Sequence, residues 1–322
     1  MVALGGGHGL AATLTSLRRL TDQITAVVGV ADDGGSSGRL RSQFGILPPG
    51  DLRMALAALC GDDAWGRTWS QVIQHRFGGD GDLAGHSLGN LLITALWEQT
   101  HDAVEGLDWV AALLEAQGRV LPCATVPLEI VAEVRGLVEE DPDALVLLRG
   151  QVSIASTAGE VVDIRLEPAQ PPACPEAVIA LQQADGIVLG PGSWFTSVLP
   201  HLLIPDLSEA IMTSPARRVV VMNVDPSRDR ETAGLPLAEH LHVMQRLLPG
   251  LRVDAVIVDP MDLDQMDLDQ MNRDPIGIDG RGSLHAACDS LGARLEVASV
   301  RSTRPGTHDP DRLAVALRAA LR

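Results

Sequence analysis

Short apolar runs alternate with helical patterns of apolar residues along most of the chain. Residues 1–4 are apolar and end in a glycine stretch, after which Leu10, Leu14 and Leu17 recur at helical spacing. A second apolar run, 24–30, is rich in β-branched residues and begins the next unit. Further strand-like runs lie at 186–189, 219–224, 253–258 and 295–300, and a closing helical pattern covers 311–321. Because strands that alternate with helices are typical of parallel sheets, the pattern predicts an α/β fold with a mostly parallel sheet and helices on both faces.

The pattern of apolar residues changes between residues 119 and 166. Shorter apolar segments at 120–126, 145–148 and 161–166 stand between turn signals, without the long helical patterns found elsewhere. We interpret this region as a small β-rich insertion on the α/β frame.

Composition and charge narrow the classes of partner. Apolar residues make up 46% of the 322 residues, but aromatic residues only 2%, with no tyrosine, so stacking platforms for single-stranded nucleic acid are scarce. The formal net charge of −17 repels phosphate backbones and anionic lipid, so neither nucleic acid nor a membrane is expected as the main partner. The four cysteines are far apart, which argues against a zinc site, and the first residues show no signal-peptide pattern, so a cytoplasmic location is expected.

Three glycine-rich turns follow apolar strands, at 5–9, 34–38 and 190–192. In an open parallel sheet all three would lie at the carboxyl edge, where ligands bind. Glycine lets the backbone approach a phosphate and present N–H groups to it, which suits an acidic protein that must hold an anion with uncharged donors. Taken singly, each turn is more often a mere tight connection, and the first turn matches neither the dinucleotide fingerprint nor a Walker loop.

Polar residues after the second strand are candidates for phosphate, sugar or metal contacts. Asp32 and Asp33 end that strand, and one of them could bind Mg²⁺ or accept from a sugar hydroxyl, or else form the turn. Ser36 and Ser37 could donate to phosphate or cap the next segment, and Arg39 could pair with phosphate or stay solvated.

Helix starts supply a further group of candidates. Asp51 is most simply an N-cap after two prolines and a glycine, and Arg53, one turn further on, could reach a diphosphate. His86 and Asn90 flank a helix start where an amide could read a sugar or base, although a lone histidine there is more often structural. His8, between glycines, is the better histidine candidate.

The third glycine turn leads directly into a predicted helix. Ser193 and Thr196 stand at its N-terminus, a natural anion site, and Asn223 ends the next strand, where it could read a hydroxyl. A serine hydrolase is disfavoured because no G-x-S-x-G nucleophile elbow is present here; Gly192-Ser193 is followed by Trp194. The candidate ligand-binding residues are Gly6, Gly7, His8, Gly9, Asp32, Asp33, Ser36, Ser37, Arg39, Asp51, Arg53, His86, Asn90, Gly190, Gly192, Ser193, Thr196 and Asn223.

Taken together, these stretches resemble the bacterial gluconeogenesis factor family, which is related to 2-phospho-L-lactate transferase. The most specific of them is the string from Asp32 to Arg39, Asp-Asp-Gly-Gly-Ser-Ser-Gly-Arg, and ordered matches run from residue 2 to about His308. The other matching stretches are 5–10, 48–53, 85–90 and 189–193.

The resemblance implies a single Rossmann-like domain over residues 1–322 that binds a uridine-diphosphate sugar, typically UDP-N-acetylglucosamine. It also implies a non-catalytic role that steers carbon into cell-wall precursors and affects cell shape, with a regulated enzyme of amino-sugar synthesis as partner and a homo-oligomeric state. The alternative is an Mg²⁺-dependent phospho-group transferase acting on a deazaflavin, in which Asp32 or Asp33 would lie near metal and phosphate.

The chain departs from the family pattern at several places. His201 replaces an asparagine, Thr307 replaces an arginine of an Arg-His-Asp string, and the stretch 223–232 keeps only its ends. Arg304 is the candidate to replace the missing arginine. The identity of the base and sugar is therefore left open.

Overall fold

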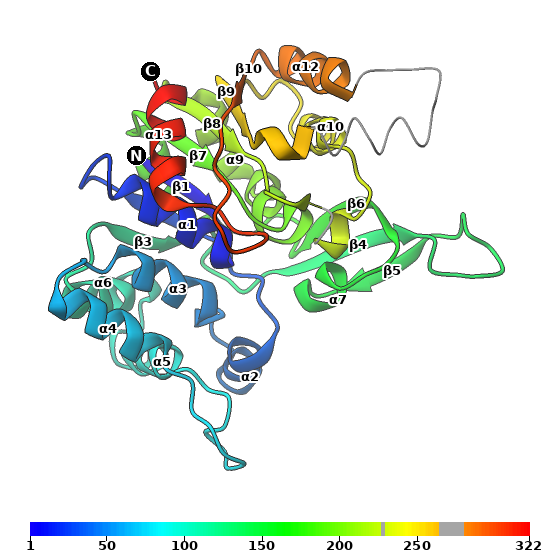
Figure 1. The fold of residues 1–322 in the computed structure, drawn as a ribbon. Coiled ribbons are helices and arrows are strands. Elements are labelled where there is room, and N and C mark those ends of the chain that lie inside the picture. The colour runs from blue at the N-terminus through cyan, green and yellow to red at the C-terminus, as the bar shows by residue number, and fades with distance from the viewer. Residues whose placement is uncertain (227–228, 264–279) are drawn as a thin grey trace.

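A computed structural model describes residues 1–226, 229–263 and 280–322. Within these residues, seven parallel strands form one sheet in the order β10-β9-β8-β7-β1-β2-β3 (Figure 1). The strands are β1 (Val2–Gly5), β2 (Thr25–Val28), β3 (Arg119–Pro122), β7 (Gly186–Leu189), β8 (Arg217–Val221), β9 (Ala255–Val258) and β10 (Arg294–Val297). The predicted α/β class with a mostly parallel sheet is confirmed.

Helices surround the sheet (Figure 1). Helix α1 packs against α3 and α13, whereas α8 packs against α9 and α10 against α12. The α-helices are α1 (Gly7–Leu17), α2 (Gly35–Phe44), α3 (Pro49–Leu59), α4 (Ala64–Gln74), α5 (Leu88–Thr100), α6 (Ala103–Leu114), α7 (Gln151–Ala155), α8 (Pro175–Gln182), α9 (Pro205–Thr213), α10 (Leu237–Leu247), α12 (Gly280–Leu291) and α13 (Pro310–Ala320). None of the helices in the described residues is both long enough and apolar enough to span a membrane.

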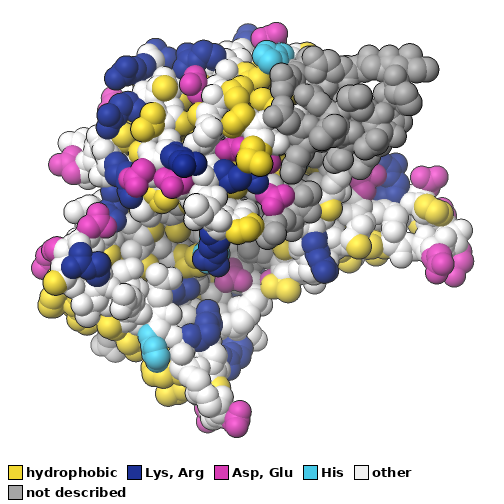
Figure 2. All heavy atoms as spheres, viewed as in Figure 1, with side chains coloured by type: hydrophobic (Ala, Val, Ile, Leu, Met, Phe, Trp, Pro, Cys, Tyr) yellow, Lys and Arg dark blue, Asp and Glu magenta, His cyan; other side chains and the backbone are white. Residues whose placement is uncertain are grey.

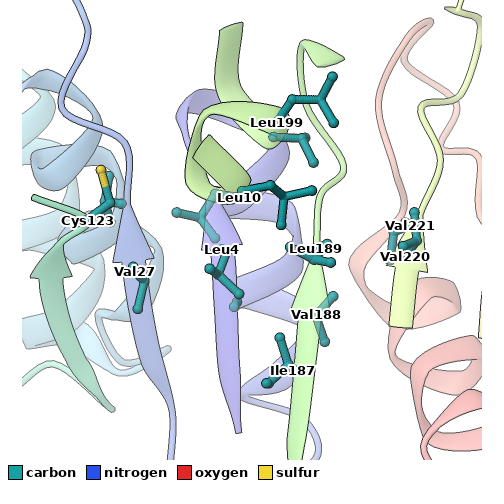
Figure 3. Packing of buried hydrophobic residues seen from close by; sticks show 14 of the residues in the cluster. Leu4, Leu10, Val27, Cys123, Ile187, Val188, Leu189, Leu199, Val220 and Val221 are labelled. Atoms are coloured by element: carbon teal, nitrogen blue, oxygen red, sulfur yellow. The ribbon is translucent and has the colours of Figure 1, made fainter. Parts of the chain in front are cut away.

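The core is built from aliphatic side chains on both sides of each central strand. Leu4 of β1, Val27 of β2 and Leu189 of β7 are buried, and Leu10 of α1 packs beside Leu4 (Figure 3). Strands covered on both faces lack polar alternation, which is why these segments read as continuous apolar runs in the sequence. The first turn of α1 is thereby fixed directly above the end of β1.

The segment after the third glycine turn is not one regular helix. Residues Trp194–Val198 form a π-helix and Leu199–Leu203 a 3₁₀-helix, where the sequence pattern predicted a continuous helix over 194–203. A short 3₁₀ turn at Arg230–Thr232 lies opposite this segment. The apolar spacing does not distinguish these helix types, because each presents similar positions to the core.

The β-rich insertion exists but begins later than predicted. Strands β4 (Glu129–Arg135), β5 (Val146–Arg149) and β6 (Glu160–Glu167) form an antiparallel sheet in the order β5-β4-β6, with a register shift between Glu133 and Val134. The predicted start at residue 119 is wrong, because Arg119–Pro122 pairs in parallel with β2 as an edge strand of the large sheet. The sequence pattern indicates a short apolar strand there, but it does not reveal which strand this segment pairs with.

The chain order of the strands creates a switch point between β1 and β7. From β1 the chain builds β2 and β3 on one side, and later builds β7 to β10 on the other. All these strands are parallel, so the turns after β1, β2 and β7 lie at one edge of the sheet, as the sequence predicted. Ligands of open α/β sheets bind at such switch points.

Candidate functional site

A cleft of about 390 Å³ opens at the switch point between β1 and β7. Its walls come from the first turn of α1, the turn after β7, the segment after β8, and the loop before α13. The lining residues are Gly6, Gly7, His8, Gly9, Ala12, Asp51, Gln151, Pro191, Gly192, Ser193, Ser197, Asn223, Val224, Asp225, Asp229, Gly306, Thr307 and His308. The volume is in the range of small-molecule sites.

The two glycine turns on either side of the switch point touch each other through their backbones. A Cβ at Gly9 would lie 2.6 Å from the carbonyl carbon of Pro191 and 2.8 Å from the Cα of Gly192. Neither atom belongs to a flexible side chain, so glycine at position 9 is required for this close approach. The contact fixes the first turn of α1 against the opposite wall of the cleft.

Asn223 holds the turn after β7 in place. Its Oδ1 accepts from the Gly192 N–H at 2.7 Å, and its Nδ2 donates to the Gly192 carbonyl at 2.9 Å and to Asp229 Oδ2 at 3.3 Å. Gly192 has φ +149°, a conformation that favours glycine. The Gly192 N–H was expected to face a diphosphate, but in this structure its hydrogen bond goes to Asn223.

Asp51 was expected to be an N-cap, but this is wrong: α3 begins at Pro49 with Pro48 as its N-cap, and Asp51 lies in the first turn of the helix. Its side chain instead stands at the N-terminus of α1. The pKa of its carboxyl is raised to about 7. Burial is the largest cause and the negative charge of Asp32 acts in the same direction, whereas hydrogen bonding to the Gly7 N–H and the charge of Arg53 oppose the rise. The carboxyl lies so close to Gly6 that a Cβ there would collide with it. Near neutral pH this side chain can therefore stand at the positive end of α1 either as an acid or as a carboxylate.

Glu231 is a second acid of this kind, and the sequence pattern did not single it out. It is buried, and its Oε1 accepts from the Phe195 N–H at 2.8 Å in the π-helix after the third glycine turn. Burial raises the pKa of Glu231 to about 8, with the nearby Asp229 adding to the rise. The N-terminus that was predicted to receive an anion at Ser193 and Thr196 thus receives a carboxyl group of the protein itself.

Four of the candidate residues form a buried hydrogen-bonded chain outside the cleft lining. The Nε of Arg53 donates to Asn90 Oδ1 at 2.9 Å, the Nδ2 of Asn90 donates to Ser36 Oγ at 3.0 Å, and Ser36 Oγ lies 3.0 Å from His86 Nδ1. All four side chains are buried. The chain joins α2, α3 and α5, so these residues position the segment that carries Asp51.

The remaining candidates after β2 also contact the protein. Asp32 accepts from the Gly34 N–H at 2.9 Å, and Asp33 accepts from the Val152 N–H at 3.0 Å, which ties this loop to α7. Arg39 donates to the Ala84 carbonyl at 2.7 Å. Ser37 is buried against Gly50, and Gly190 and Thr196 lie behind the cleft wall rather than in it.

The structure thus separates the predicted site into two groups. Those that line the cleft are Gly6, Gly7, His8, Gly9, Asp51, Gly192, Ser193 and Asn223. Those that do not are Asp32, Asp33, Ser36, Ser37, Arg39, Arg53, His86, Asn90, Gly190 and Thr196.

Two ion pairs of Arg301 hold the segment that leads into the fourth wall of the cleft. Arg301 bridges the carboxylates of Asp259 and Asp262, and Asp259 Oδ2 also accepts from the Val300 and Arg301 N–H groups at 3.0 Å. The loop that follows brings Thr307 and His308 to the cleft. Sequence reasoning treated this region only as a departure from a family pattern.

The cleft has few cationic groups. Among the described residues that line it there is no lysine or arginine. Burial lowers the pKa of His308 to about 4, and its Nε2 lies 3.1 Å from the Met222 carbonyl, so this ring is neutral at pH 7. An anionic ligand would therefore depend on backbone N–H groups and neutral side chains, as the sequence predicted for an acidic protein.

Comparison with known proteins places this architecture in a family. Residues 1–300 match the family described as "2-phospho-L-lactate transferase CofD". The chain belongs to this family. The resemblance inferred from the glycine turns and the Asp-Asp-Gly-Gly-Ser-Ser-Gly-Arg string is thereby confirmed.

Within the CofD family, the chain is similar to proteins with a second description. It is 51% identical over 319 residues to the "Putative gluconeogenesis factor" of Mycobacterium leprae, covering 98% of this chain and 84% of that protein. It is 36% identical over 255 residues to the "Gluconeogenesis factor" of Bacillus subtilis, covering 79% of this chain and 77% of that protein.

A solved crystal structure has the same fold. The crystal structure of a UPF0052 family member from Bacillus halodurans matches with a TM-score of 0.81 and 32% sequence identity, covering 100% of this chain and 98% of that chain. The seven-stranded sheet and its surrounding helices are therefore shared with an experimentally determined relative.

Proposed function

We propose that this protein binds a nucleotide sugar of the UDP-N-acetylglucosamine class in the switch-point cleft and acts as a regulator rather than a catalyst. The observation that carries the proposal is the position of the cleft. It lies between the carboxyl ends of β1 and β7, where the chain order reverses, and a glycine turn followed by a helix N-terminus forms its floor.

The first turn of α1 is the proposed diphosphate site. Helix geometry leaves the first N–H groups without intrahelical partners, and Gly6, at the N-cap position, offers no side chain to satisfy them. The Gly7 N–H is hydrogen-bonded to Asp51, so His8 and Gly9 would present the remaining N–H groups to phosphate oxygens. The neutral form of Asp51 would remove one competing negative charge from this end of α1.

Polar groups on the opposite wall would contact the sugar. Ser193 and Asp229 lie there, and hydroxyl groups of a sugar are suitable partners for both. Burial raises the pKa of the Asp229 carboxyl.

The regulatory role rests on the names of the relatives. A gluconeogenesis factor that binds an amino-sugar nucleotide would link carbon metabolism to the supply of cell-wall precursors and so to cell shape, through a partner enzyme of amino-sugar synthesis in the cytoplasm. The acidic chain, with its net charge of −17, is not proposed to bind DNA.

Isothermal titration calorimetry with UDP-N-acetylglucosamine, UDP-glucose, UDP and GDP tests the ligand class. We expect the UDP-sugars to bind and GDP to bind more weakly or not at all. His8→Ala, at an exposed cleft residue, should weaken binding, whereas His75→Ala, at an exposed residue outside the cleft, should leave it unchanged. Equal binding by both variants would refute the proposed location.

The family description supports a second candidate, a phospho-group transferase. The resemblance adds that such an enzyme would depend on Mg²⁺ and act on a deazaflavin. The described residues contain no group of three or more histidine, cysteine or acidic side chains arranged for a metal ion. Magnesium would therefore depend on ligand phosphates together with one or two carboxylates, for which Asp32 and Asp51 are the neighbouring pair. Product formation from a phospholactate-linked guanine nucleotide and a deazaflavin, dependent on added Mg²⁺, would favour this candidate.

A further inference from the structure

The strand β5 (Val146–Arg149) lies at an open edge of the three-stranded sheet. Among the described residues its only strand partner is β4. The Gly150 N–H donates to the Ile130 carbonyl of β4 at 2.9 Å, so the even-numbered residues of β5 direct their backbone groups toward β4. Because these directions alternate along a strand, Leu145, Leu147 and Arg149 direct their N–H and C=O groups away from the sheet.

Apart from Arg149 at its end, this edge carries little of the usual protection against pairing. Leu145 and Leu147 are 55% and 53% exposed, and the segment 144–148 holds no charged residue and no proline. Native proteins commonly protect free edges with lysine, proline, bulges or a covering element. Figure 2 shows hydrophobic side chains along the projecting arm that contains β5 in Figure 1, with acidic side chains at its tip.

We propose that β5 pairs with β5 of a second copy of this chain, in antiparallel register centred on Val146. Leu145 of each copy then lies opposite Leu147 of the other copy. Both residues direct their backbone groups outward, so each pair can exchange two N–H···O=C hydrogen bonds. The two antiparallel sheets join into one continuous sheet.

Charge complementarity selects this register. Asp143, in the turn before β5, and Arg149, at its end, lie three residues on either side of Val146. Arg149 already pairs with Glu129 and Glu167 of its own sheet, and its side chain is 51% exposed, so Asp143 of a second copy would be a third carboxylate beside it. Antiparallel pairing about Val146 therefore brings Asp143 of one copy beside Arg149 of the other at both ends of the interface. A register centred on Leu147 would place Arg149 opposite Leu145 instead and lose this pairing.

The interface lies next to the candidate site. Gln151, two residues after the end of β5, lines the cleft, and the Val152 N–H donates to Asp33. Pairing at β5 would therefore steady the wall of the cleft that Gln151 contributes.

Sedimentation equilibrium of the full chain over a range of concentrations tests the proposal. The wild type should associate to a dimer. Leu145→Lys/Leu147→Lys should be monomeric, because the pairing would place like charges opposite each other. Leu145→Glu/Leu147→Lys should dimerise again, because each glutamate then faces a lysine of the second copy.

Leu83→Lys, at a leucine that is 54% exposed but lies far from β5 in sequence, is the control and should dimerise like the wild type. All substituted positions are more than half exposed, so the monomer fold should survive, as circular dichroism can verify. A monomeric wild type, a dimeric double-lysine variant, or a monomeric Glu/Lys variant would each overturn the proposal.

Discussion

Gly9→Ala tests whether the two glycine turns are locked together at the switch point. Helix propensity alone predicts that alanine should stabilise α1, by up to ~1 kcal/mol. The structure predicts the opposite sign. The added Cβ would lie 2.6 Å from the carbonyl carbon of Pro191 and 2.8 Å from the Cα of Gly192.

The size of the effect follows from these contacts. Carbon atoms in contact are normally separated by about 3.5 Å or more, so the turn or the helix must move by roughly 1 Å. Backbone atoms cannot rotate away as a side chain can, and overpacking of this kind costs ~1–3 kcal/mol. After subtraction of the propensity gain, we expect Gly9→Ala to lower the free energy of unfolding by up to about 2 kcal/mol.

Urea denaturation monitored by circular dichroism measures this difference. Gly81→Ala is the matched control, because a Cβ at Gly81 meets nothing within 4 Å. It should change the free energy of unfolding by less than ~0.5 kcal/mol. A Gly9→Ala protein at least as stable as the wild type would refute the reasoning about the contact between the turns.

Further predictions concern the polar groups around the cleft. Asn223→Asp should weaken ligand binding and destabilise the fold by about 1–3 kcal/mol, because the Gly192 carbonyl loses its donor and faces a carboxylate; calorimetry and urea titration check this. Ser36→Ala should cost about 1–3 kcal/mol of stability, because the buried Asn90 amide loses its acceptor, but should leave the ligand Kd nearly unchanged. The raised pKa of Asp51 means that the folded protein binds this proton more tightly than the unfolded chain. The stabilisation of the fold by this proton is therefore complete below pH 4 and is lost as the pH rises through about 7. The free energy of unfolding of Asp51→Asn minus that of the wild type should therefore grow between pH 4 and 8, by at most ~4 kcal/mol, and a pH-independent difference would contradict the assignment.

The sequence was sufficient to locate the edge of the sheet where the cleft lies. Glycine turns after three buried apolar strands must lie at one edge if those strands are parallel, and the structure has them so. His8 and Asp51 were likewise found from local pattern, as residues beside a glycine turn and at a helix start. These inferences needed only the direction of each strand and the position of its end.

Contacts between distant segments could not be predicted in this way. Asn223 was expected to hydrogen-bond a hydroxyl group of the ligand. In the structure it is hydrogen-bonded to Gly192, 31 residues away, in a geometry set by the neighbouring strands β7 and β8. Glu231 gave no sequence signal, because its importance comes from burial against Phe195, 36 residues earlier. Ser36 was assigned to the ligand because of its motif, and only the packing of α2 against α5 shows that its hydroxyl meets Asn90.

The most direct test of the central claim is a crystal structure of this protein grown with UDP-N-acetylglucosamine. The account predicts the nucleotide sugar in the switch-point cleft, with diphosphate oxygens within hydrogen-bond distance of the backbone N–H groups at the start of α1 and the sugar beside Ser193 and Asp229. A ligand bound with its diphosphate away from α1, or in a different cavity, would contradict it.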